Sequence, residues 1–151
     1  MKRFKFRLES LLKHRETVQD LREQEFARAQ SRHDALKLQL NALEEHYQQT
    51  IADRPVAEIG ARFDAPRIQS REQYLQAVQL QMARQTEQVE IARLIAEEMR
   101  IQMVSARQAC EAVTRLRDKD YAEYQAEVQR KTQEELDEIA AVRFTRQQSD
   151  G

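Results

Sequence analysis

The residues of this chain that could support catalysis or metal binding are few and widely spaced. Three histidines, His14, His33 and His46, and a single cysteine, Cys110, are the side chains that would bind zinc most readily. A zinc site needs several such ligands at close spacing, and a nucleophilic thiol needs a basic partner nearby. One internal glycine, Gly60, cannot form a glycine-rich phosphate loop. We therefore predict that the protein is not an enzyme and uses no metal, cofactor or small-molecule substrate.

The composition favours long helices over a thick apolar core. Of the 151 residues, 34% are charged, and the mean hydropathy is -0.85. Glu, Gln, Arg, Ala and Leu dominate, and all of them are good helix formers. The net charge of -1 argues against a general nucleic-acid-binding protein. The charge is nevertheless uneven, because residues 1–15 contain six Lys or Arg and one Glu. This bias predicts a basic end that docks on a partner.

The helix-breaking residues gather in one window. Pro55, Gly60 and Pro66 all lie between residues 54 and 67, and proline ends a helix or distorts it. The stretch from Ser70 to Gln73 reads as a capping box, which marks a helix start. We therefore predict a single domain over 1–151, with one helix at about 7–53, a turn at 54–69, a second helix at about 70–144 and a frayed tail.

Apolar residues recur at spacings of three and four in both predicted helices, which is the heptad pattern of a coiled coil. The sequence thus predicts an all-α fold, a long antiparallel two-helix coiled-coil hairpin in which the numbers of facing residues add up to about 123. His33 and Cys110 fall on this seam, so we interpret them as packing residues. The seam positions are Phe26, Ala29, His33, Leu36, Leu40, Leu43 and Tyr47 in the first helix, and Leu75, Val78, Met82, Gln85, Val89, Ala92, Ala96, Met99, Met103, Ala106, Cys110 and Val113 in the second.

Three further features lie outside this regular seam, and the third is open to more than one interpretation. An earlier stripe, Leu8, Leu11, Leu12, Val18 and Leu21, is offset by five residues from Phe26, which predicts an irregularity in the supercoil. Tyr124, Val128, Leu136 and Ile139 fall on a part of the second helix that has no facing segment. The segment "FKFRLESLLKHRE", residues 4–16, is the beginning of the seam, a basic anchor on an anionic membrane surface, or an arm that enters an acidic protein cavity. Because Phe4 and Phe6 alternate with Lys5 and Arg7, an extended arm fits them better than a helix face.

Several segments taken together resemble the flagellar export protein FliJ family. They are "FRLESLLKHRE" near the start, "EQYLQAV" after the turn and "LRDKDYAEYQAEVQRKTQEELDEIA" near the end. The stalk proteins of virulence-type secretion systems look similar. The resemblance implies a coiled coil similar to the central stalk of rotary ATPases, with a non-enzymatic role in type III protein export and flagellum assembly. It also implies a place on the cytoplasmic side of the cell membrane, peripheral to it, at the flagellar basal body.

The resemblance further implies three partners: the hexameric export ATPase, the cytoplasmic region of the membrane export gate, and export chaperones. The gate-binding positions carried over to this chain are Leu36, Leu40, Leu43, Tyr47, Tyr74 and Val78, with Gln81 and Gln85 at two further family positions. For the ATPase ring, the family implies the paired termini, and we predict the region that contains Phe4, Phe6, Arg7, Leu8 and Lys13. The alternatives are a virulence-type stalk and a homo-oligomeric structural coiled coil.

Overall fold

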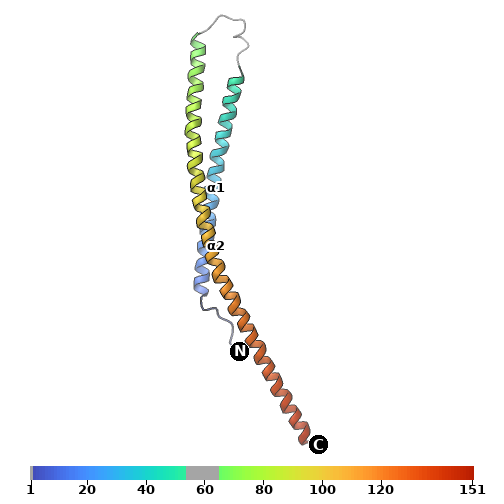
Figure 1. Ribbon diagram of the computed structural model, residues 1–151. Helices are drawn as coiled ribbons and strands as arrows, with labels where there is room; N and C mark the ends of the chain where they lie inside the picture. Colours follow the sequence, from blue (N-terminus) through green and yellow to red (C-terminus); the bar gives the residue numbers. More distant parts are fainter. Residues whose placement is uncertain (1, 54–64) are drawn as a thin grey trace. The chain divides into compact units, whose positions relative to one another are not determined.

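The computed structural model describes residues 2–53 and 65–151, and within them the fold is an antiparallel pair of long helices with no strand (Figure 1). Helix α1 spans Glu9–Ala52 and helix α2 spans Ala65–Ser149. The contacts divide the chain into two units: unit 1 is Met1–Gln19 with Ser105–Gly151, and unit 2 is Asp20–Val104. The predicted all-α hairpin is therefore confirmed. The predicted turn at 54–69 lies largely outside the described residues.

The ends of α2 differ from the predicted ones. The helix begins at Ala65 and not at Ser70, so the sequence from Ser70 to Gln73 lies inside the helix and is not its cap. The reason is Pro66, which sits in the first turn, where its missing N–H would have had no helical partner in any case. At the other end α2 continues to Ser149, beyond the predicted 144, because no glycine or proline interrupts it before Gly151.

The seam of unit 2 follows the predicted heptads. Leu40, Val78, Ala92 and Ala96 are buried, and the other predicted seam residues of the unit are half-buried. Ala92 and Ala96 are the smallest of these buried side chains. Gln85 is a polar seam residue, and it donates to the Leu36 carbonyl oxygen at 3.2 Å. The register agrees with the predicted sum of about 123, because His46 bonds to Tyr74 and Tyr47 to Gln79.

Leu21 is a correction, since it was predicted on the earlier apolar stripe and is 50% exposed. At about 100° per residue, the five-residue step to Phe26 turns the helix by roughly 500°, so the two side chains cannot share a face. Polar residues occupy this part of the seam. Arg22 and Glu25 are half-buried there and form an ion pair at 2.8 Å.

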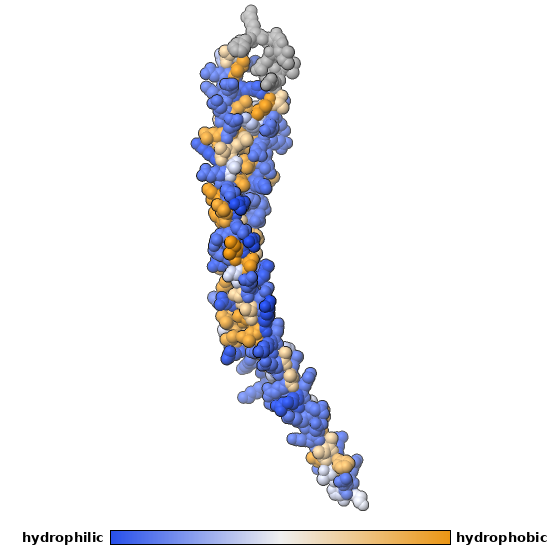
Figure 2. All heavy atoms as spheres, viewed as in Figure 1, coloured by the Kyte–Doolittle hydropathy of each residue, from blue (hydrophilic) through white to orange (hydrophobic). Residues whose placement is uncertain are grey.

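The core of unit 1 consists of Phe6, Leu12 and Cys110, with Phe4, Leu8 and Val113 packed against it. Beyond Val128, the side chains of α2 are all exposed. Leu136, Ile139, Val142 and Phe144 are between 51% and 62% exposed. The predicted uncovered stripe is thus present at Leu136 and Ile139, whereas Tyr124 and Val128 are half-buried. The visible face in Figure 2 is mostly hydrophilic, with separate hydrophobic patches.

In the part of the chain that the structure describes, neither helix has a segment that is long and apolar enough to cross a membrane.

Candidate functional site

Unit 1 begins with an N-terminal arm, residues 2–8, which precedes α1 and has no regular secondary structure. Alternating apolar and basic residues give an extended segment two different faces. Phe6 on one face is only 7% exposed and packs with Leu12 and Cys110. The Phe6 carbonyl oxygen accepts a hydrogen bond from the Glu9 amide at 3.3 Å, at the point where α1 begins. The segment is therefore not part of a helix, in agreement with the prediction from the alternation, and it is fixed to its own unit.

Phe4 holds the beginning of the arm on α2 through aromatic contacts. Its ring lies 5.1 Å from that of Tyr121 in an edge-to-face arrangement and 5.4 Å from that of Tyr124. Tyr121 and Tyr124 stack at 6.3 Å. Each aromatic pair of this kind contributes about 0.5–1.5 kcal/mol beyond the area it buries. The Tyr124 hydroxyl also donates to the Lys2 carbonyl oxygen at 3.0 Å, so both backbone and side chain tie the arm down.

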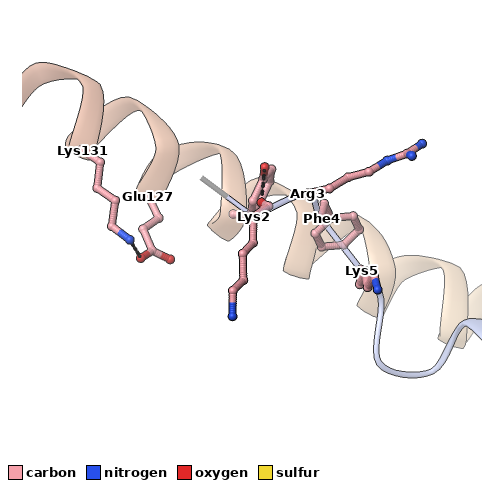
Figure 3. A pocket seen from close by; sticks show the side chains of 7 residues that line it. Lys2, Arg3, Phe4, Lys5, Glu127 and Lys131 are labelled. Carbon is pink, nitrogen blue, oxygen red and sulfur yellow. Dashed lines mark hydrogen bonds and ion pairs between the residues drawn. The ribbon is translucent and has the colours of Figure 1, made fainter.

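The arm carries a basic surface, which we define as Lys2, Arg3, Lys5 and Arg7. None of these four cations forms an ion pair with a residue that the structure describes, whereas Glu127 is already paired with Lys131 at 3.0 Å. Figure 3 shows Lys2 and Arg3 extending away from α2 in different directions. The pKa of the Glu127 carboxyl lies below its usual range because of its hydrogen bond to Lys131. The basic surface therefore has charge to offer to an acidic partner.

Two hollows adjoin the arm. One, of about 460 Å³, is lined by Lys2, Arg3, Phe4, Lys5, Tyr124, Glu127 and Lys131 (Figure 3). The other, of about 450 Å³, is lined by Arg3, Phe4, Lys5, Phe6, Glu9 and Arg117. Basic side chains and the ring of Phe4 line both hollows, which suits a protein surface carrying acidic residues around an apolar contact.

The residues predicted to face an ATPase ring are only partly available. Phe6 is buried, and Phe4 and Leu8 are half-buried against the core of unit 1. Arg7 and Lys13 are exposed. The interpretation that Phe4 and Phe6, predicted in the ATPase-facing region, both remain free to face a partner is wrong for Phe6, because its side chain is buried in the core with Leu12 and Cys110.

In unit 2, the described residues next to the turn form a second candidate surface, the turn-side surface: His46, Tyr47, Arg71, Tyr74 and Gln79. The His46 Nε2 atom lies 2.7 Å from the Tyr74 hydroxyl, with the two rings perpendicular. Gln79 donates to the Tyr47 hydroxyl. Arg71 donates to the last carbonyl oxygens of α1, Thr50 at 2.8 Å and Ile51 at 3.3 Å, and so caps that helix.

The predicted gate-binding residues differ in how far they are exposed. Leu40 and Val78 are buried in the seam, and Leu36, Leu43 and Tyr47 are half-buried. Tyr74 is 47% exposed, so it is the predicted residue with most surface to offer. The sequence reasoning missed His46 and Arg71, although the sum rule of about 123 places both close to the residues they bond.

The histidines and the cysteine are distributed along the helices. His14 and His46 are exposed, and the His33 side chain is 15% exposed beside Asp34 at 3.1 Å. Hydrogen bonds from His33 and Gln30 hold the pKa of Asp34 below its usual range. Cys110 is buried. The described residues include no group of three His, Cys, Asp or Glu that could hold a metal ion.

A family model described as "Flagellar FliJ protein" matches residues 4–149, which is nearly the whole chain and includes both candidate surfaces. No curated protein matches. No solved structure matches either.

Proposed function

The chain belongs to the flagellar FliJ protein family, and from this premise we propose that it is a non-enzymatic stalk and adaptor of the flagellar type III export apparatus. In this proposal, unit 1 docks in the ring of the export ATPase and the turn-side surface docks on the cytoplasmic region of the export gate. The protein thereby couples ATP hydrolysis by its partner to protein export, and it also binds export chaperones. It acts in the cytoplasm, peripheral to the membrane, at the flagellar basal body.

The family match over residues 4–149 carries the proposal. Its description as flagellar favours a flagellar role over that of a virulence-type stalk. The cations of the basic surface, which form no ion pair with the residues that the structure describes, support an acidic docking site on the ATPase, since opposite charges steer two proteins together and speed their association. The exposed Tyr74, held by His46, supports a contact on the gate, because tyrosine is enriched among the residues that dominate binding energy at interfaces.

Charge reversal tests the docking of unit 1. We expect Lys2→Glu with Lys5→Glu to weaken binding to the purified ATPase by about tenfold or more, and added salt to weaken the wild-type complex. The matched control is Arg115→Glu with Lys119→Glu, which changes the net charge equally on exposed residues of α2 in the same unit. Binding that falls equally in both variants would contradict docking through the arm.

Removal of two tyrosine rings tests the turn-side surface. We expect Tyr47→Ala with Tyr74→Ala to weaken binding to the cytoplasmic region of the gate, and Tyr74→Phe to preserve most of it, because the ring and not the hydroxyl makes the contact. Leu38→Ala, at a position that is 71% exposed on α1, is the control. Unchanged gate binding by the double variant, with helicity retained, would reject this part of the proposal.

A further inference from the structure

Helix α2 carries a second apolar stripe in unit 2, separate from the seam. Leu80, Ile91, Leu94, Ile95 and Ile101 are all between 48% and 55% exposed. At about 100° per residue, four of them fall within a sector of roughly 80°, and Ile95 lies about 40° outside it. The same count places Ala92 and Ala96, which are buried against α1, on the opposite side of the helix. α2 thus has one apolar face that is covered and another that is not.

This stripe is more than the usual scatter of surface hydrophobic residues. Single exposed apolar side chains are normal on proteins, and Leu38 on α1 is one of these. On α2, by contrast, the stripe follows alternating steps of four and three, which is the spacing of a coiled-coil contact face. Its positions are Leu80, Arg84, Glu87, Ile91, Leu94, Glu98 and Ile101.

The order of residue types along the stripe is nearly self-complementary in the antiparallel direction. If two copies of the stripe are placed about a two-fold axis at Ile91, Ile91 meets its own equivalent and Leu80 meets Ile101. In the same register Arg84 lies opposite Glu98. Glu87 of one copy then lies across from Leu94 of the other, with its carboxylate at the edge of the interface. A parallel arrangement would instead oppose Arg84 to Arg84 and Glu98 to Glu98.

We propose that the stripe on α2 is the docking surface for a second copy of this chain, in an antiparallel two-fold dimer centred on Ile91. The interface has an apolar layer at each end and at its centre, and the Arg84–Glu98 pairs set orientation and register, as polar pairs do in coiled coils. The interface is short and partly polar, so we expect the dimer to be weak and to dissociate reversibly. This inference does not depend on the export role.

Sedimentation equilibrium of the full chain over a roughly hundredfold range of concentration is the first test. We expect a reversible monomer–dimer equilibrium, and Ile91→Lys to raise the dissociation constant by about tenfold or more, because the charge would meet its own copy across the axis. Leu38→Lys, the same change on an isolated exposed leucine, leaves it unchanged. A wild-type chain that stays monomeric throughout, or equal effects of the two variants, would overturn the proposal.

Exchanging the charges tests the register of the dimer, and cross-linking tests whether a second copy of this chain occupies the stripe. Arg84→Glu alone and Glu98→Arg alone should each weaken the dimer, and the double variant should restore it, while circular dichroism confirms that the helix is retained. In a chain with Cys110→Ala, Ile91→Cys should form an intermolecular disulfide on mild oxidation, and Leu38→Cys should not. Failure of the double variant to rescue the dimer would reject the antiparallel register. Monomeric stripe variants that lose a different protein partner would assign the surface to that partner instead.

Discussion

Phe6 anchors the N-terminal arm, and we expect its replacement by alanine to make the arm open more often from the rest of unit 1. The side chain is 7% exposed and packs with Leu12 and Cys110. Truncating a buried phenylalanine costs about 3–5 kcal/mol in a thick core. Here the core is small and close to solvent, so its neighbours can collapse into the space, and we expect a cost of about 3 kcal/mol.

Most of this cost should appear as local opening of the arm, because Phe6 precedes α1 and supports no helical hydrogen bond within it. The buried Cys110 thiol reports the opening directly. If labelling requires the arm to lift, a loss of about 3 kcal/mol raises the population of the open state, and with it the labelling rate, by roughly a hundredfold. The assay is the rate of reaction of Cys110 with a thiol reagent under native conditions.

Two control variants make the result interpretable. Phe6→Leu keeps part of the buried volume and should give an intermediate labelling rate, whereas Arg7→Ala changes an exposed neighbour and should have little effect. Thermal unfolding, followed by circular dichroism in parallel, shows whether the helices remain folded while the thiol reacts. A labelling rate for Phe6→Ala within about twofold of the wild-type rate would refute the arm as the cover of Cys110.

Two further predictions concern unit 2. Arg71→Ala removes the donor to the last carbonyl oxygens of α1 and should speed amide exchange in that turn while lowering stability by about 0.5–1 kcal/mol; Arg71→Lys should recover only part of this. Acid should also weaken the unit, because hydrogen bonds from Arg93 and Arg100 lower the pKa of Glu90 and Glu97. Their stabilising contribution is complete above the unfolded carboxyl pKa and is lost as pH falls through the lowered folded values. Glu90→Gln with Glu97→Gln should flatten the acid limb of a plot of unfolding midpoint against pH, and an unchanged slope would contradict this.

The hairpin was predictable because the sequence signals that specify it are periodic and involve residues close together in the chain. Apolar residues at three- and four-residue steps determine which faces of two helices meet, and the breakers between residues 54 and 67 determine that the chain returns. Leu40, Val78 and Cys110 were all assigned to the seam in this way, and all three are buried. The predicted start of α2 was wrong because a serine followed three residues later by a glutamine, here Gln73, has the pattern of a capping box wherever it occurs in a chain. The capping box was excluded only by the structure, in which the preceding proline lies in the first turn of α2 and the helix therefore begins before the serine.

The arm was harder to predict because its contacts join residues more than a hundred positions apart. The alternation of Phe4 and Phe6 with Lys5 and Arg7 indicated an extended segment, but not the surface on which it lies. Tyr121 and Tyr124 supply that surface. The sum rule, extended beyond the helix start, would have placed Phe4 opposite about residue 119, within a turn of Tyr121. The signal was therefore in the sequence, although heptad analysis alone did not include it.

The burial of Phe6 also changes what a docking experiment on unit 1 can show. Deleting residues 1–12 would remove Phe6 and Leu12, two of the three core residues of the unit, together with every cation of the basic surface. Loss of ATPase binding in such a deletion would report unfolding and docking at once. Reversing Lys2 and Lys5 changes only exposed charges and leaves the aromatic contacts in place. If that variant keeps Cys110 protected and still loses the ATPase, the charge of the arm, and not its rings, is what the partner recognises.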